Sequence, residues 1–188
     1  MKHGRLYAAP DVARFCGVDL TTVHAWVKRG AIAHERSPGG QLRFRRVCLV
    51  AFLMERNFPI PKAISREFGL VGAVGALPSQ VVGALAEIAD VWHEPSPIRA
   101  FVELRERSPD VLVLGTTLGF SRVVLVREVS SVDPHLVVAC LASSPAEGLA
   151  FRDAGAKVVG LSGLEDTFVA ALAQVLGREP AAPSKPRG

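Results

Sequence analysis

Short apolar segments alternate with amphipathic segments throughout residues 69–177, and this alternation limits the folds open to the chain. The apolar runs have the length of strands. The segments between them have the length of helices, with apolar residues three or four positions apart. A strand followed by a helix and a second strand forms a parallel pair, with the helix packed on the sheet. The alternation therefore predicts an α/β fold, a doubly wound five-stranded parallel sheet covered on both faces.

The expected strands of this domain cover residues 70–76, 91–93, 110–114, 136–141 and 157–160, and its expected helices cover residues 79–89, 97–107, 121–129, 146–154 and 164–176. We assign the domain to residues 69–177. The segment 178–188 is rich in Pro and Ala and has too few apolar side chains to form a core. We expect it to be a disordered tail.

The beginning of the chain has a different organisation, with two short helices. Pro10–Cys16 has apolar residues at helical spacing, and Gly17 breaks the pattern. Asp19 is a good N-cap for a second helix, Leu20–Arg29, which Gly30 ends. Two short helices joined by a tight turn predict a helix-turn-helix.

A basic hairpin and a third helix are expected to follow. Two strand-like runs, residues 31–36 and 41–45, flank the sequence SPGG, which favours a tight reversal of the chain. Residues 46–56 have the apolar stripe of a helix. A helix-turn-helix followed by a hairpin predicts a winged domain.

The end of this first domain is marked by Pro59-Ile60-Pro61, because Pro cannot continue a helix. We assign residues 1–60 to the winged helix-turn-helix domain and residues 61–68 to a linker. The core of the winged domain is expected to contain three large apolar side chains, Val23, Trp26 and Phe44.

The net charge of +4 is unevenly divided between the two domains. Residues 1–68 contain 12 Lys and Arg against 5 Asp and Glu, a net charge of +7, and residues 69–188 contain 10 against 13, a net charge of −3. A basic domain attracts polyanions, so the winged domain is expected to bind nucleic acid.

Other sequence features argue against several kinds of protein. Cys16, Cys48 and Cys140 are scattered, with no CxxC motif, which argues against disulfides and against a metal site. No apolar run approaches the roughly 20 residues that span a bilayer, and the N-terminal residues lack a signal peptide. We therefore expect a cytoplasmic protein without membrane contact. No nucleophile–base pair is visible, so we expect no enzyme and no cofactor.

Three segments of the first domain, YAAPDVARFCGV, DLTTVHAWVKRGAI and RSPGGQLRFRR, resemble the winged helix-turn-helix of the MerR superfamily. The likeness is greatest to its small excisionase and BldC-like members and covers residues 6–60. In that family the second helix enters the major groove of double-stranded DNA, and the hairpin is a wing on the backbone or minor groove. The resemblance implies nine DNA-contacting residues: Thr21, Thr22, His24, Lys28, Arg36, Gln41, Arg43, Arg45 and Arg46.

The start of the second helix departs from this family. Members often carry arginines there, whereas this chain has Thr21, Thr22 and Ala25, so a bidentate Arg–guanine contact is missing. This departure supports an alternative, in which the winged domain binds no specific DNA and the protein is an interaction adaptor in a bacterial signalling pathway.

The second domain resembles the receiver domain of response regulators, through SPDVLVLG (residues 108–115) and FRDAGAKVVGLSG (residues 151–163). Receivers use acidic groups to bind magnesium at the phospho-acceptor, and a hydroxyl and a lysine to hold the phosphoryl group. The resemblance puts residues without these groups at those positions: Gly75, Ala76, Gly115, Cys140 (or Leu141) and Ser162. We therefore predict a pseudo-receiver, with Gly115 at a degenerate phosphorylation site.

A cobalamin-binding domain is the other flavodoxin-like candidate, because some MerR relatives carry one. Asp133-Pro134-His135 is similar to the Asp-x-His ligand signature of such domains. The Gly that should follow is absent, and the motif precedes the fourth expected strand instead of following the first. We therefore expect no cobalamin.

Together these features predict a DNA-binding transcriptional regulator or nucleoid-associated factor with a phosphorylation-independent pseudo-receiver. In receivers the last helix commonly contributes to a dimer face, which here implies a homodimer through Leu164–Leu176. Docking of another signalling protein on the pseudo-receiver is also open, as is binding of a small ligand by it. Head-to-tail binding of monomers is expected if the protein does not dimerise.

Overall fold

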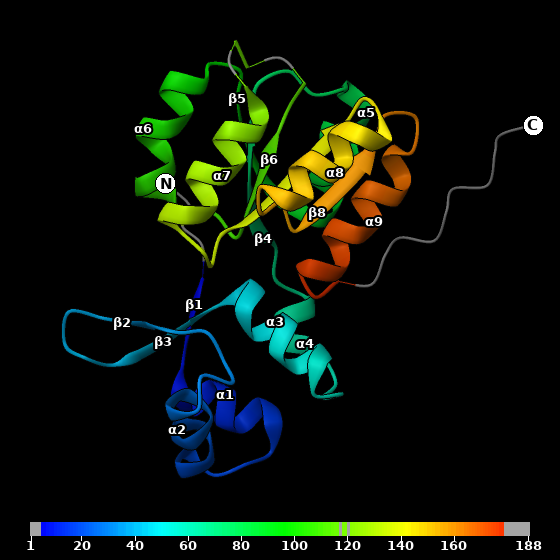
Figure 1. Ribbon diagram of the computed structural model, residues 1–188. Coiled ribbons are helices and arrows are strands. Elements are labelled where there is room, and N and C mark those ends of the chain that lie inside the picture. Colours follow the sequence, from blue (N-terminus) through cyan, green and yellow to red (C-terminus); the bar gives the residue numbers. More distant parts are fainter. Residues whose placement is uncertain (1–4, 117, 120, 179–188) are drawn as a thin grey trace, which may run out of the picture.

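The computed structural model describes residues 5–116, 118–119 and 121–178. The chain forms a small winged half and a larger α/β half, with the winged half beneath the sheet in Figure 1. The expected tail at 178–188 lies outside the described residues except for Arg178, whose backbone N–H donates to the Ala173 carbonyl at the end of the last helix.

From residue 5 onward, the winged half contains three strands and four helices: β1 (Leu6–Ala8), α1 (Ala9–Cys16), α2 (Leu20–Lys28), β2 (Glu35–Arg36), β3 (Leu42–Arg45), α3 (Arg46–Glu55) and α4 (Lys62–Ser65). Its antiparallel sheet has the order β1-β3-β2. Strand β1 was not expected, because three residues are too few to show a periodicity. It pairs Tyr7 with Phe44 and adds a third strand to the predicted hairpin.

The helix-turn-helix forms where the sequence predicts it. Asp11 accepts a hydrogen bond from the Ala8 backbone N–H at 3.0 Å and so stabilises the start of α1. Gly17 ends that helix in a left-handed conformation, with φ 64°, which costs glycine little. The expected core is confirmed: Val23 and Phe44 are fully buried, and Trp26 is half-buried against Phe52, with ring centroids 5.0 Å apart.

The α/β half contains five strands and five helices within the described residues: β4 (Gly69–Val74), α5 (Ser79–Ile88), β5 (Ala89–Glu94), α6 (Pro97–Arg107), β6 (Val111–Leu114), α7 (Arg122–Val132), β7 (Val137–Ala142), α8 (Pro145–Asp153), β8 (Val158–Leu161) and α9 (Glu165–Val175). All strand pairs are parallel, in the order β5-β4-β6-β7-β8. The predicted fold class, a winged helix-turn-helix followed by a doubly wound five-stranded sheet, is confirmed.

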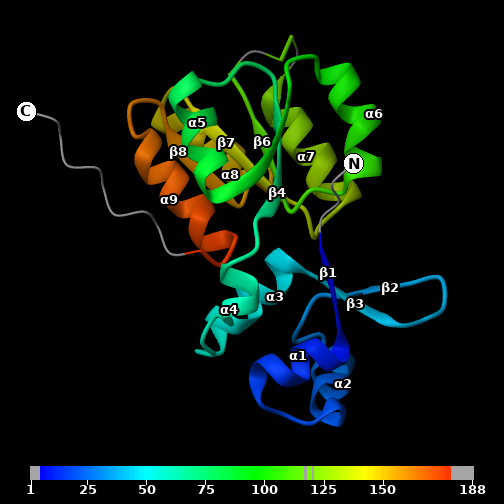
Figure 2. The same cartoon turned by 180° about the vertical axis from the view of Figure 1, so that it is seen from behind.

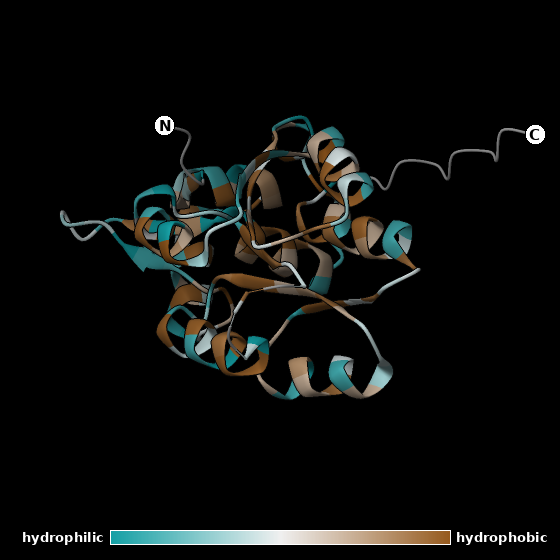
Figure 3. Cartoon of the chain, turned by 90° about the horizontal axis from the view of Figure 1, so that it is seen from above, coloured by the Kyte–Doolittle hydropathy of each residue, from teal (hydrophilic) through white to brown (hydrophobic). Residues whose placement is uncertain are grey.

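Each face of this sheet packs against its own set of helices. Val71, Val113 and Leu141 point towards α5 and α9, which are seen in front of the sheet in Figure 2. Leu112 and Cys140 point to the opposite face, covered by α6, α7 and α8. Strands β4, β6 and β7 are therefore apolar along their whole length, because both faces are buried, and strands in the middle of Figure 3 are brown. The edge strand β5 is only half-buried and carries Asp90, His93 and Glu94.

The segment predicted as a linker is part of the packed structure. It contains α4, and Ile64 of that helix is fully buried in the core of the winged half. Val47 of α3 belongs to the same apolar cluster as α5 and α9 of the α/β half. The two halves are therefore held together by side-chain packing as well as by the chain.

Candidate functional site

The outer face of α2 carries most of the residues expected on its DNA-facing side. Thr21, His24 and Lys28 are exposed at positions i, i+3 and i+7, so they lie on one face of the helix, and Thr22 is half-buried beside them. The opposite face is fixed by Val23 in the core. The burial of one side of α2 therefore determines which side chains can meet a nucleic acid.

The wing is the β2–β3 hairpin, and its tip extends away from the helices of the winged half and from the α/β half, as Figures 1 and 2 show from opposite sides. Its turn is closed by a hydrogen bond from the Gly40 N–H to the Ser37 carbonyl at 2.8 Å, and Gly40 has a φ of 74°. The Arg36 side chain donates to the Gly40 carbonyl at 2.9 Å. In Figure 3 the hairpin is coloured as hydrophilic, so its surface is suited to contact a polar partner.

A concave surface joins α2 to the wing. It encloses about 450 Å³ and is lined by seven residues, His24, Val27, Lys28, Arg36, Gly40, Gln41 and Leu42. Four of the residues expected to contact DNA thus lie together, two from the helix and two from the hairpin. Arg43 lies beside them, donating to the Gln41 side-chain oxygen at 2.6 Å and to the Leu42 carbonyl at 3.1 Å. This basic concave surface is the candidate nucleic-acid interface.

Arg45 was expected on the wing surface, but the structure directs it towards the α/β half. Its Nη1 donates to Asp133 at 2.7 Å, and its Nε donates to Glu35 of the neighbouring strand. Burial disfavours the charged guanidinium, but these two carboxylates outweigh it and raise the pKa of Arg45. Arg45 is therefore an ion-pair partner between the two halves, not a free cation for phosphate.

Arg46 was also expected on the wing surface, and this interpretation is wrong, because its side chain is only 1% exposed. It is the first residue of α3 and donates to three backbone carbonyls, those of Leu176 at 3.0 Å, Ile64 at 2.5 Å and Glu67 at 2.8 Å. The sequence could not show this, because four arginines within the eleven residues 36–46 look the same whether or not one side chain turns inward. Arg46 joins the winged half to the end of α9.

The carboxyl edge of the five-stranded sheet lies on the side away from the winged half (Figure 1). Gly115 follows β6 there, and its N–H donates to the Val74 carbonyl at 2.8 Å. Gly75 and Ala76, expected in the first strand, follow β4 at the same edge, and Ser162 follows β8, where its N–H donates to the Ala142 carbonyl. No carboxylate stands at any of these four positions.

Cys140, expected at the hydroxyl position, lies inside β7 and is fully buried. Burial raises the pKa of its thiol to about 12, so it is neutral at physiological pH. The alternative position, Leu141, is also fully buried and has an apolar side chain. Neither residue presents a hydroxyl group to the edge of the sheet.

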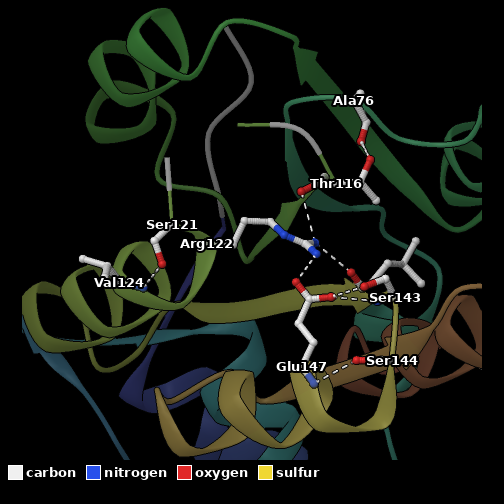
Figure 4. Close-up of polar contacts among 10 residues, drawn as sticks. Ala76, Thr116, Ser121, Arg122, Val124, Ser143, Ser144 and Glu147 are labelled. Atoms are coloured by element: carbon white, nitrogen blue, oxygen red, sulfur yellow. Dashed lines mark hydrogen bonds and ion pairs between the residues drawn. The ribbon is translucent and has the colours of Figure 1, made fainter. Parts of the chain in front are cut away.

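An arginine crosses this edge instead, and the sequence reasoning missed it. Arg122 of α7 donates to the carbonyls of Leu141 at 2.7 Å and Gly115 at 3.3 Å, and its Nη2 contacts Glu147 of α8 at 2.5 Å (Figure 4). Its side chain is 10% exposed. The ion pair therefore ties two helices together across the ends of β6 and β7. The one sequence signal was an arginine at the start of a helix, where a cation is unfavourable.

Glu147 is held by several donors at once. Its Oε2 accepts hydrogen bonds from the backbone N–H and the hydroxyl of Ser143, at 2.8 and 2.7 Å. Burial opposes the charge, but these donors and Arg122 outweigh it and lower the pKa of Glu147. Figure 4 shows both side chains pointing towards one another from their helices. The edge thus contains a neutralised ion pair in place of a cluster of acids.

The described residues contain neither a metal-binding cluster nor a membrane-spanning helix. Among them, no group of three or more His, Cys, Asp and Glu side chains is arranged to hold a metal ion. None of the helices in this part of the chain is long and apolar enough to cross a membrane.

Comparison with protein families assigns the winged half. Residues 6–57 match the family model described as "Helix-turn-helix domain". The chain has an N-terminal helix-turn-helix domain. The match covers the α2 and wing residues that line the concave surface. A search of curated proteins finds no match to the chain.

Solved structures resemble the α/β half. The BeF3-activated receiver domain of DrrB has a TM-score of 0.51 at 19% identity, covering 60% of this chain and all of that one. The isolated REC domain of RcsB from Salmonella enterica serovar Typhimurium has a TM-score of 0.50 at 16% identity, covering 63% of this chain and 95% of that one. The response regulator DrrB, a Thermotoga maritima OmpR/PhoB homolog, has a TM-score of 0.51 at 18% identity, with coverages of 59% and 54%. At these identities the likeness shows the receiver fold alone.

Proposed function

We propose that this protein is a DNA-binding transcriptional regulator or nucleoid-associated factor whose receiver-like domain works without phosphorylation. The observation that carries the proposal is the concave surface formed by α2 and the wing, where His24 and Lys28 face Arg36 and Gln41. A helix beside a basic hairpin can place hydrogen-bond donors in the major groove while cations neutralise the backbone on either side.

The roles of the DNA-facing residues follow from their positions. Thr21, Thr22 and His24 lie in the first turns of α2 and can reach base edges or phosphates with single hydrogen bonds. Lys28 and Arg43 supply charge for phosphates. No arginine lies in α2 itself, so base recognition rests on single donors, and we expect moderate sequence discrimination. This arrangement is MerR-like, but with a weaker base-reading helix.

The receiver-like half is proposed to be a pseudo-receiver. Gly75, Ala76 and Gly115 put no acid at the positions that the resemblance assigns to the acidic pair and the phospho-acceptor, and the Arg122–Glu147 pair spans the edge. Magnesium needs a cluster of oxygen ligands with negative charge, which this edge does not offer. We assign the protein no catalytic activity and no cofactor, and we place it in the cytoplasm on the nucleoid.

A homodimer through α9 is part of the proposal. Phe168 and Leu172 are buried on the sheet, so these two cover the core, whereas Leu164 is 55% exposed and Val175 is half-buried. A dimer would fix two winged halves at one spacing and raise the affinity for paired sites. Light scattering after size exclusion tests this, and a monomer would favour head-to-tail binding instead.

The deciding experiment is a salt titration of binding to a promoter-derived duplex by the full-length protein. With three phosphate contacts, from Lys28, Arg36 and Arg43, affinity should fall about 40-fold between about 50 and about 200 mM salt. Absence of binding at the lowest salt would overturn the regulator proposal. It would favour the second candidate, an interaction adaptor in a bacterial signalling pathway, which the absence of arginine from α2 supports.

A further inference from the structure

A groove of about 750 Å³ lies between the winged half and the α/β half. The winged half contributes α3 and the segment Ala31–Ala33, which connects α2 to the wing. The α/β half contributes the turn at His135, the edge strand β8 and the helix α9. Pockets for small molecules have this range of volume and occur preferentially between domains.

The walls of this interdomain groove are mainly apolar. Its aliphatic and thioether lining includes Val47, Val50, Ala51 and Met54 from α3 and Val137, Val158, Ala171 and Val175 from the α/β half. Ala51 and Met54 are exposed, with 50% of Met54 accessible. Water in the groove finds few hydrogen-bond partners on such walls, so its replacement by the apolar part of a ligand is favourable.

The rim of the groove on the α/β side is basic. Arg152 lies near the end of α8 and Lys157 lies just before β8, and both are exposed. Among the described residues, neither of these two cations is in an ion pair with a carboxylate. Glu55 is the one acidic residue of the lining, and it belongs to α3 on the other wall. The α/β rim therefore complements a negative charge.

We propose that the interdomain groove binds an apolar small molecule that carries one anionic group, such as a medium-chain or aromatic carboxylate. The apolar part packs against α3, β8 and α9. The anionic group lies at the rim and is bound by Arg152 and Lys157, because a cation with free donors stabilises a carboxylate at a partly dry site. The occupant contacts Ala31–Ala33 and thus the segment that carries α2 into the wing.

The test uses the full-length protein and a fluorescent apolar anion, anilinonaphthalene sulfonate, with decanoate and decanol as competitors. One saturable site per chain is expected. Decanoate should displace the probe, and decanol, which has the same chain without the charge, should bind about tenfold more weakly, equivalent to about 1.4 kcal/mol. No saturable binding, or equal displacement by both competitors, would overturn the proposal.

Two variants locate the site. Ala51→Trp places a large ring on the exposed wall of the groove and should abolish saturable binding of the probe, so that neither competitor has bound probe to displace. The double variant Arg152→Gln, Lys157→Gln should weaken decanoate about tenfold and leave decanol unchanged. The matched controls are Ala86→Trp on the exposed face of α5 and Arg127→Gln on α7, which lie outside the groove and should behave like the wild type.

The double variant keeps the proposal testable if Ala51→Trp does not fold. Arg152 and Lys157 are surface side chains, so the double variant is expected to fold even if Ala51→Trp does not, and circular dichroism checks both. Probe binding that is unchanged in folded Ala51→Trp, or a double variant that binds decanoate as tightly as the wild type, would place the ligand elsewhere and overturn the proposal.

Discussion

A side chain at position 115 would collide with the backbone of Ala76. A Cβ atom built on Gly115 lies 2.2 Å from the carbonyl oxygen of Ala76 and 2.9 Å from its nitrogen, closer than real Cβ atoms approach such atoms. Gly115 is not among the residues with positive φ, so space and not backbone conformation requires glycine here. The turn after β4 occupies the place into which an acceptor side chain would project.

Restoring an acid at this position should therefore not restore phosphorylation. Gly115→Asp must displace the Ala76 backbone, so we expect the free energy of unfolding to fall by about 3 kcal/mol. Treatment with acetyl phosphate and magnesium should add no phosphoryl mass to the variant or to the wild type. Gly83→Asp is the control, because nothing lies within 4 Å of a Cβ at this position in α5. A stable Gly115→Asp protein that takes up a phosphoryl group would contradict the proposed pseudo-receiver.

The Arg122–Glu147 pair should contribute to stability as a unit. We expect a coupling free energy of about 1–2 kcal/mol from urea unfolding of Arg122→Gln, Glu147→Gln and the double variant, because the arginine is largely buried and each partner has further hydrogen bonds. Arg107 and Glu103, an i,i+4 pair on α6, provide the comparison, with an expected coupling of about 0.3–0.5 kcal/mol. Equal couplings for the two pairs would show that the carboxyl edge gains nothing from its buried cation.

Arg46 should determine whether the two halves unfold together. Arg46→Met leaves three backbone carbonyls, two of them in buried hydrogen bonds, without their donor. We expect a loss of about 3–5 kcal/mol in the free energy of unfolding. Calorimetry should then show two separate transitions, the winged half melting first. Arg66→Met at the exposed end of α4 is the matched control and should keep a single transition. An unchanged melting profile for Arg46→Met would contradict the joining role of this residue.

Asp110 should make the stability of the protein depend on pH. It is 3% exposed and accepts a hydrogen bond from the Leu70 N–H at 2.9 Å. Burial raises the pKa of its carboxyl from 3.8 to about 6, against the lowering effects of the Leu70 hydrogen bond and of Arg46 and Arg45. As the pH rises, the unfolded chain loses this proton first. The contribution of Asp110 to stability is therefore full below about pH 4 and is lost by about pH 6.

The variant Asp110→Asn keeps a neutral acceptor for Leu70 at every pH. At neutral pH it should be more stable than the wild type by up to about 3 kcal/mol, and the difference should vanish near pH 4. Urea unfolding at several pH values measures this difference. Asp153→Asn, on the exposed surface of α8, should show no such trend. A stability difference between Asp110→Asn and the wild type that does not change with pH would mean that burial does not disfavour the ionised carboxylate of Asp110.

Arg43 should act on DNA through charge. Arg43→Ala should weaken duplex binding and lower the slope of log affinity against log salt by about 0.9, the value of one phosphate contact. Arg127→Ala removes the same charge from the exposed surface of α7, far from the concave surface, and should leave the slope unchanged. If both variants reduce the slope equally, the protein binds DNA through its overall charge and not through the wing.

The sequence by itself predicted both domains and nearly every helix and strand. The signals for these elements are local in the sequence. The spacing of apolar residues in α9 or β6 indicates which side of the element is buried, and the backbone preferences of Gly17 and Asp19 favour the end of α1 and the start of α2. The exposed side of α2 follows directly, because the burial of Val23 leaves Thr21, His24 and Lys28 outside. Strand β1 and helix α4 were missed because each is too short for a periodic signal.

Only the tertiary structure decided what the charged side chains do. Arg43, Arg45 and Arg46 are neighbours in sequence, yet one lies on the wing, one pairs with Asp133 and one is buried against Leu176. Asp133 and Leu176 lie 88 and 130 residues away from these arginines, so no local pattern contains the contacts that join the two halves. The same holds for Gly115, whose lack of a carboxylate was visible in the sequence. The contact with Ala76 that excludes any side chain there exists only once β4 and β6 lie side by side, because the packing of distant elements determines the space at each position.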